Sequence, residues 1–256
     1  MDQANPLSAP MIGRSRTFDD PYRPCEEEEE EFYNKNKYLA AVGALLYLST
    51  YTHPHIYFAT SVFARHSQRP RVRHWNGVKH LFRCLRGMED LGLHYTKEGA
   101  LEIIGYADAD FKSDEKSGRS QTGYIFHKNN APISWKSMKQ TVTATSANHL
   151  ELIVFHEATM EAVYMVTHHA QDITKQCGLA QDNKPTIFED NAACVTQVGA
   201  EFIKTDRVKH ICPQIFGFTQ DLIQSGKIKV KKIDLAHNIA DMMTKALPTY
   251  THRRLV

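Results

Sequence analysis

The apolar positions follow a helical spacing in the first part of the chain. Tyr38, Val42 and Leu45 begin one apolar face, and a similar pattern resumes after the break at Pro54. Side chains three and four residues apart lie on the same side of a helix, so this spacing predicts amphipathic helices. We expect them over residues 38–48, 56–63 and 73–85.

From Gly92 onward the apolar runs become short and are separated by turn residues. This pattern predicts strands over 91–96, 101–107, 122–126, 132–135, 186–188 and 228–233, with Asn129-Asn130 as a hairpin turn. Helices are expected over 146–167, from 191, over 207–223 and over 238–245. Consecutive strands followed by alternating helices and strands indicate an α/β fold with a mixed sheet.

Residues 1–37 differ in composition from the rest of the chain. They contain four prolines and the acidic run Glu26–Glu31. Such a segment buries little apolar surface, so we expect an extended or disordered acidic linker. The predicted organisation is therefore a linker over 1–37, a helical part over 38–90, an α/β domain over 91–248 and a tail over 249–256.

The composition excludes several classes of protein. The five cysteines show no Cys-x-x-Cys spacing, which argues against a disulfide framework or a zinc site. No apolar run approaches the length of a membrane span, and the N-terminus lacks a basic-then-apolar signal pattern. We expect an intracellular protein that is not secreted and has no membrane partner and no small-molecule cofactor.

Four acidic residues, each on a different predicted element, are the strongest chemical signal. Asp108 ends a strand, Glu151 lies in an apolar helix, Asp190 follows a short strand and Asp241 lies on the last helix. Converging carboxylates need a cation, and hard oxygen ligands favour Mg²⁺ or Mn²⁺. The order strand, helix, strand, helix predicts a site for two metal ions that hydrolyses a phosphodiester.

Other interpretations of these acids are open. Asp190 could cap the helix that follows it, and Asp110 fits a turn-capping role better than a metal ligand. Glu157 and Glu161 fit ordinary acids on a helix surface. Glu189 should point to the side opposite Asp190 because strand side chains alternate.

A basic run without any acid lies between residues 65 and 86. It predicts a surface that follows a phosphate backbone, and the alternative is a solvated helix face. The cations are Arg65, Arg69, Arg71, Arg73, Lys79, Arg83 and Arg86.

Longer motifs point to a known family. Residues 38–248 resemble the end of the Pol polyprotein of copia-type long-terminal-repeat retrotransposons of plants. The matching stretches include His-Trp-Asn-Gly-Val-Lys-His at 74–80, Gly-Tyr-Ala-Asp-Ala-Asp at 105–110, Glu-Asp-Asn-Ala-Ala-Cys at 189–194 and Asn-Ile-Ala-Asp-Met-Met-Thr-Lys-Ala-Leu-Pro at 238–248. The polymerase motif of the family, an aromatic-x-Asp-Asp turn between two strands, is absent from this sequence.

The resemblance implies a fold and an activity. The fold would be RNase H-like, a mixed five-stranded sheet with flanking helices, preceded by a small helical remnant of a reverse transcriptase thumb and connection. Asp108, Glu151, Asp190 and Asp241 fall on the catalytic, metal-binding carboxylates of the family. The implied activity is cleavage of the RNA strand of an RNA–DNA hybrid with two Mg²⁺ or Mn²⁺ ions.

Two further expectations accompany this resemblance. His210 and His237 are candidates for handling a proton, although a surface histidine is the alternative. The partners would be an RNA–DNA hybrid or other nucleic acid and a polymerase-containing Pol chain, in a cytoplasmic particle or the nucleus. The alternative function is a catalytically silent, domesticated or decaying remnant that binds nucleic acid.

Overall fold

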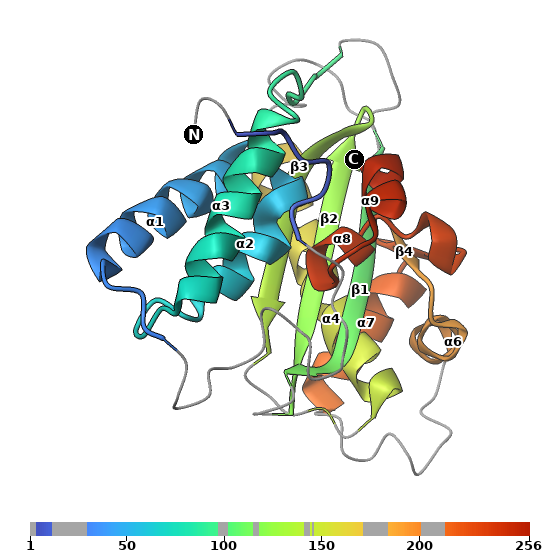
Figure 1. Ribbon diagram of the computed structural model, residues 1–256. Helices are drawn as coiled ribbons and strands as arrows, with labels where there is room; N and C mark the ends of the chain where they lie inside the picture. The colour runs from blue at the N-terminus through green and yellow to red at the C-terminus, as the bar shows by residue number, and fades with distance from the viewer. Residues whose placement is uncertain are drawn as a thin grey trace. The chain divides into compact units, whose positions relative to one another are not determined.

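The computed structural model describes residues 4–11, 30–96, 102–114, 118–140, 144, 146–170, 184–200 and 213–256. The chain forms two compact units (Figure 1). The first unit contains Met1–Leu93 and Asp241–Val256, and the second contains His94–Ala240. The expected division near residue 90 is close to this one, but the chain from Asp241 onward belongs to the first unit. No helix among the described residues is long and apolar enough to span a bilayer.

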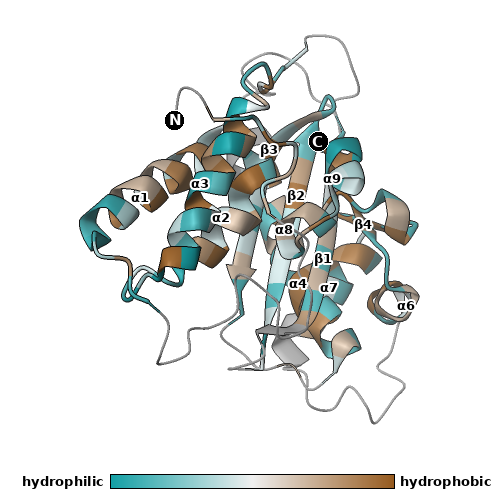
Figure 2. Ribbon diagram, in the orientation of Figure 1, coloured by the Kyte–Doolittle hydropathy of each residue, from teal (hydrophilic) through white to brown (hydrophobic). Residues whose placement is uncertain are grey.

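The first unit is built from helices, as the apolar spacing predicted. They are α1 (Lys35–Tyr51), the short helix η1 (Pro54–Ile56), α2 (Tyr57–Ala64), α3 (Val72–Arg86), α8 (Asp241–Thr244) and α9 (Thr249–Leu255). Figure 2 shows hydrophobic and hydrophilic positions on each of α1, α2 and α3. The hydrophobic positions form a core in which Tyr38, Leu45 and Phe63 are completely buried. The Tyr38 hydroxyl donates to the Phe63 carbonyl at 2.8 Å, which satisfies the buried polar atom.

The chain ends are more structured than expected. Met11 and Phe32, both in the expected linker, are buried in the core of the first unit. The Phe32 N–H donates to the Pro70 carbonyl at 2.9 Å, and α1 begins at Lys35. The expected tail forms α9 instead. Apolar residues are few in both segments, and only the tertiary structure shows that Met11 and Phe32 are buried.

The second unit is a mixed α/β domain. Its strands are β1 (Ile103–Asp114), β2 (Arg119–Lys128), β3 (Ala131–Lys139), β4 (Thr186–Glu189) and β5 (Lys229–Lys232). They form a five-stranded sheet in the order β3-β2-β1-β4-β5. β1, β2 and β3 pair antiparallel, and β4 and β5 continue the sheet parallel to β1. This confirms the expected mixed five-stranded sheet.

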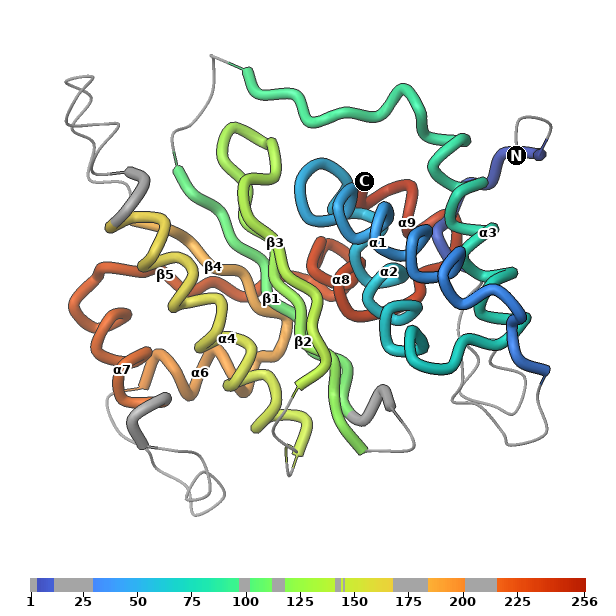
Figure 3. Tube along the Cα trace, turned by 90° about the vertical axis from the view of Figure 1, so that its left-hand side faces the viewer, coloured from blue at the N-terminus to red at the C-terminus, as the bar shows by residue number. Residues whose placement is uncertain are grey.

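Helices cover one face of this sheet (Figure 3). They are α4 (Ala147–Tyr164), which continues into the π-helical turn η2 (Met165–Ala170), α6 (Ala192–Gly199) and α7 (Pro213–Gln224). A short helix, η4 (Leu235–His237), follows β5. Leu150, Val154 and Phe155 on α4 pack with Ile187 and Phe126 of the sheet in one core. α4 and β1 are thereby held together, which positions the side chains described below.

Two local predictions about the sheet had opposite outcomes. Asn129 and Asn130 have φ of 50° and 62°, so the hairpin turn between β2 and β3 is confirmed. The strand expected over 91–96 does not form, and these residues are irregular. Leu91 and Tyr95 are 44% and 60% exposed, so the alternating pattern there has no buried face to stabilise a strand.

Candidate metal centre

Three of the four predicted carboxylates converge in the second unit. Carboxylate oxygens of Asp108, Glu151 and Asp190 all lie within 4.8 Å of one another. They come from β1, from α4 and from the bend after β4. Asp108 is 2% exposed and Glu151 is 8% exposed, so water screens their repulsion poorly. Such a group of oxygens fits a divalent cation.

Asp108 is fixed by the centre of the sheet. β1 has a neighbour on both sides, and Asp108 lies opposite Gly123 of β2, which has no side chain to compete for space. The neighbouring Ala107 carbonyl accepts a hydrogen bond from the Asn238 side-chain amide at 2.8 Å. Asn238 is completely buried, so this bond anchors the chain after β5 beside β1.

Glu151 reaches the cluster because of where α4 begins. The Ser146 hydroxyl caps the helix by accepting the His149 N–H at 3.1 Å, which sets the start of the helix. Glu151 lies between the buried residues Leu150 and Leu152. The apolar neighbours hold the helix against β1 and leave the carboxylate inside the domain, where it needs a charged partner.

Asp190 is not the cap of the helix that follows it. That role belongs to Asn191, whose side-chain oxygen accepts the N–H groups of Ala193 and Cys194 at 2.9 and 3.1 Å. The alternative interpretation of Asp190 as a helix cap is therefore wrong. Because Asn191 satisfies the helix terminus, the Asp190 carboxylate is available to the cluster.

Glu189 is a fourth acid near this cluster that the sequence interpretation set aside. It is completely buried, and its Oε1 accepts the Asn191 N–H at 3.1 Å. Burial raises its pKa well above the usual range, and the negative charges of Asp190 and Asp108 raise it further. Its position at the end of a short buried strand was the available signal, since both faces of an inner parallel strand are covered.

Cys194 is a possible sulfur ligand close to these carboxylates. Its thiol is completely buried, and burial raises its pKa well above the ordinary value. The nearby charges of Glu189, Glu151 and Asp190 raise that pKa further. Among the described residues, the atoms that converge closely enough to hold a cation are carboxylate oxygens and do not include this sulfur. The donors that fit a cation are oxygens, which Mg²⁺ and Mn²⁺ prefer.

Three other residues were predicted for the site, and each is described by its own surroundings. Asp241 begins α8 in the first unit, where its Oδ1 accepts from Lys245 Nζ at 2.8 Å. His237 is exposed on η4, and its N–H donates to the Asp234 carbonyl. His210 lies outside the described residues.

Three acids that were not assigned to the site lie outside the group of Asp108, Glu151 and Asp190. β1 continues to Asp114, so Asp110 lies within the strand opposite Gln121 and caps no turn there, contrary to expectation. Glu161 accepts hydrogen bonds from Ser134 and Tyr124 at 2.6 and 3.3 Å. Burial raises the pKa of Glu157. Glu157 and Glu161 thus face the sheet, which the interpretation as surface acids missed.

The basic run of the first unit is less available than its sequence indicated. Arg71 is buried and pairs with Glu31 at 3.5 Å, and Arg69 pairs with the same carboxylate. Arg83 and Arg86 donate to the carbonyls of the N-terminal segment. Lys79 is exposed. Arg71 is therefore removed from the expected surface, because its cation stabilises the fold of the first unit.

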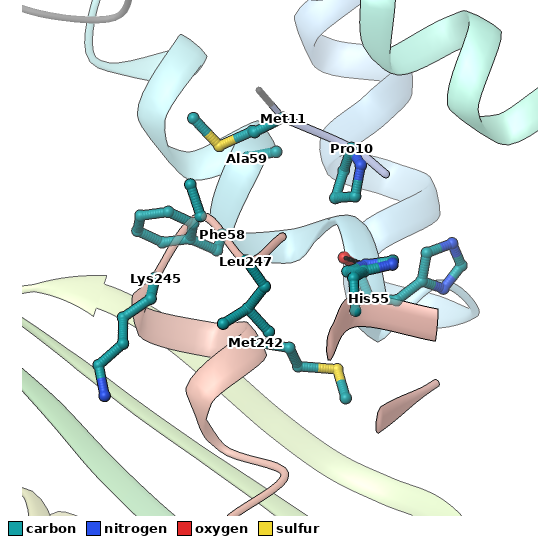
Figure 4. A pocket seen from close by; sticks show the side chains of 10 residues that line it. Pro10, Met11, His55, Phe58, Ala59, Met242, Lys245 and Leu247 are labelled. Atoms are coloured by element: carbon teal, nitrogen blue, oxygen red, sulfur yellow. Dashed lines mark hydrogen bonds between the residues drawn. The ribbon is translucent and has the colours of Figure 1, made fainter. Parts of the chain in front are cut away.

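A small pocket in the first unit does not resemble a catalytic site. It is lined mainly by apolar side chains, among them Phe58, Met242 and Leu247, together with His55 (Figure 4). Lys245 also lines it, but its amino group points away from the apolar side chains (Figure 4). This amino group pairs with Asp241. The lining is therefore mainly apolar, with few polar groups that could take part in a reaction.

The strand order and connections of the second unit define its class, an RNase H-like domain with an acidic cluster at the junction of β1, β4 and α4. The homologues of the chain over most of its length are copia-type retrotransposon Pol polyproteins of plants. The chain is 29% identical over 248 residues to the Pol polyprotein from transposon TNT 1-94 of Nicotiana tabacum. The matched region covers 97% of this chain and 18% of that polyprotein.

A second relative matches only part of the chain. It is the secreted RxLR effector protein 161 of Plasmopara viticola, 38% identical over 128 residues, which are 50% of this chain and 90% of that protein. No protein-family model matches the sequence. Among solved structures, an RNase H1 isolated from compost by a metagenomic approach is 16% identical and superposes with a TM-score of 0.38. The match covers 57% of this chain and 94% of the RNase H1 chain.

Proposed function

We propose that this chain is a metal-dependent RNase H that cuts the RNA strand of RNA–DNA hybrids. The observation that carries the proposal is the convergence of the Asp108, Glu151 and Asp190 oxygens within 4.8 Å. Similarity to retrotransposon Pol polyproteins supports nucleic acid as the substrate class. Because the chain spans 14–18% of the Pol polyproteins it matches, the activities of the whole polyprotein are not assigned to it.

Each carboxylate of the cluster would have a role in metal-dependent hydrolysis. Asp108, Glu151 and Asp190 would hold two Mg²⁺ or Mn²⁺ ions. Bound ions of this kind supply an activated water and stabilise the leaving oxygen. The protein contributes fixed carboxylates in a poorly solvated position, which need no rearrangement before the reaction. A hybrid would be recognised by its helical shape and its 2′-hydroxyls, with little sequence preference.

Cleavage of a labelled RNA–DNA hybrid in Mg²⁺, compared with EDTA, tests the proposal. Asp190→Asn removes one ligand charge, and we expect the rate to fall about a thousandfold, which corresponds to about 4 kcal/mol of barrier. Asp110→Asn is the matched control, because it makes the same chemical change two residues from Asp108 on β1. It should cut as fast as the unmodified chain.

A second measurement separates loss of activity from loss of the site. Mn²⁺ binding, followed by electron paramagnetic resonance, should weaken in Asp190→Asn and stay unchanged in Asp110→Asn. Equal cleavage by the unmodified chain and Asp190→Asn would refute the assignment. Binding of hybrid without any cleavage in Mg²⁺ or Mn²⁺ would favour the alternative of a catalytically silent nucleic-acid-binding remnant.

A further inference from the structure

The edge strand β5 carries a group of lysines that the metal centre does not use. Lys227, Lys229, Lys231 and Lys232 are all exposed, and no ion pair joins them to a described residue. We define these four residues as the β5 lysine strip. Ile228 and Val230 alternate with Lys227, Lys229 and Lys231 and pack against the core, so Lys229 and Lys231 project from the opposite face of the sheet. Lys232 follows Lys231 directly and is on the same side of the strand as Val230.

The strip lies next to the strand that leads into the acidic cluster. β5 pairs in parallel with β4, and Lys232 lies opposite Glu189, the residue before Asp190. The Ile233 N–H donates to the Glu189 carbonyl at 3.0 Å, which fixes this end of the register. Neighbouring strands lie about 4.8 Å apart, so the strip begins within one strand spacing of the chain that carries the cluster.

We propose that the β5 lysine strip binds the sugar-phosphate backbone of the nucleic-acid duplex whose strand enters the acidic cluster. This inference rests on the proposed function, since it extends the same substrate beyond the carboxylates. Unpaired lysines on a strand can each neutralise a phosphate and release a counterion, which gives affinity without sequence preference. Arg69 and Arg71 differ from the lysines of the strip because they pair with Glu31, whereas the lysines have no ion pair with a described residue.

The competing explanation is protection of a sheet edge. β5 ends the strand order, and exposed lysines on edge strands prevent pairing with another chain. Lys229→Glu/Lys231→Glu separates the two explanations, because glutamate also protects an edge but repels phosphate. Lys35→Glu/Lys128→Glu is the control with the same change in net charge, at two positions outside the strip.

The test is fluorescence anisotropy of a labelled RNA–DNA hybrid in EDTA, with KCl varied from about 50 to 200 mM. For Lys229→Glu/Lys231→Glu we expect binding to weaken about tenfold or more and the slope of log affinity against log salt to become shallower by about 1.8. The control should keep the slope of the unmodified chain. Size-exclusion chromatography should show both variants with the elution volume of the unmodified chain, and Lys231→Glu alone provides a milder version if the double variant does not fold.

Three outcomes would overturn the proposal. The first is an unchanged slope in Lys229→Glu/Lys231→Glu, which would leave edge protection as the explanation. The second is an equal loss in the control. The third is loss of binding to phosphatidylserine vesicles with hybrid binding intact, which would make the strip a lipid-binding surface. Absence of cleavage with the expected change in slope would refute the proposed function while leaving the strip in place.

Discussion

Acidification should destabilise the first unit through a buried histidine on α3. His74 is completely buried, and its Nδ1 accepts the Arg71 N–H at 3.1 Å. Burial lowers its pKa from 6.5 to about 3, and the positive charges of His66, Arg73 and Arg71 contribute. A proton on Nδ1 would also remove the acceptor that Arg71 uses, so the native state resists protonation.

The sign and size of the effect follow from linkage between protonation and folding. The unfolded chain takes up the proton near pH 6.5, whereas the folded chain does so only near pH 3. The stability is therefore present above pH 6.5 and is lost as the pH falls toward 3. At pH 5 the loss from His74 is about 2 kcal/mol, from 1.36 kcal/mol for each of the 1.5 pH units below 6.5. His55, whose pKa burial also lowers to about 3, should add a similar loss.

Urea unfolding of the whole chain at pH 7 and pH 5 tests this prediction. The chain has two tryptophans, so Trp135→Phe leaves Trp75 of α3 as the reporter of the first unit. We expect the unfolding free energy to fall by about 4 kcal/mol between the two pH values. His74→Asn keeps an oxygen that can accept from Arg71 and should lose about half of this dependence. The reasoning fails if the unfolding midpoint is the same at both pH values, or if His74→Asn keeps the full dependence.

Two further substitutions test the second unit. A Cβ on Gly105 would lie 2.2 Å from the Phe126 ring, so Gly105→Ala should destabilise by about 1–3 kcal/mol in chemical denaturation. Gly217→Ala in α7, with open space around it, should instead stabilise by up to about 1 kcal/mol, and equal effects would contradict the packing argument. Glu189 has a raised pKa, so in EDTA the unmodified chain should lose stability as the pH rises above the usual range of a glutamate. Glu189→Gln should remove that loss of stability. If the unfolding free energy of the two proteins changed with pH in the same way, the ionisation of Glu189 would not destabilise the fold, and the prediction would be wrong.

The sequence predicted the regular elements wherever a buried face repeats at a fixed period. α1, α3 and α4 have such a face, and each lies within a few residues of its predicted bounds. β1, β2 and β3 were also predicted, but β1 extends to Asp114, well beyond its predicted end at residue 107. The strand expected over 91–96 failed because alternation alone does not show whether a face is covered. The burial of Met11 and Phe32 could not be predicted either, because each makes its contacts with residues far away in the sequence.

The candidate site was predictable in its ligands but not in its surroundings. Glu151 lies in an apolar stretch and Asp190 directly follows a strand, which is a local signal that a single sequence carries. Asp108 was expected to end a strand, but it lies inside β1, which continues to Asp114. Whether Asp190 or Asn191 caps α6 depends on whether the helix begins one residue earlier or later. Helix boundaries of this kind are set by tertiary packing. The effect of Glu189 on the cluster depends on how deeply β4 is buried, which its neighbours in sequence do not show.

The two lysine- and arginine-rich segments show why a count of cations is a poor guide to a binding surface. The run from Arg65 to Arg86 contains no acid, yet Arg69 and Arg71 pair with Glu31, far away in the sequence. A phosphate would have to displace that carboxylate, so little affinity would be gained. β5 is much shorter, but its lysines are exposed and have no ion pair among the described residues. Net attraction for a polyanion depends on unpaired charge, and this makes β5 the stronger candidate although its sequence signal is weaker.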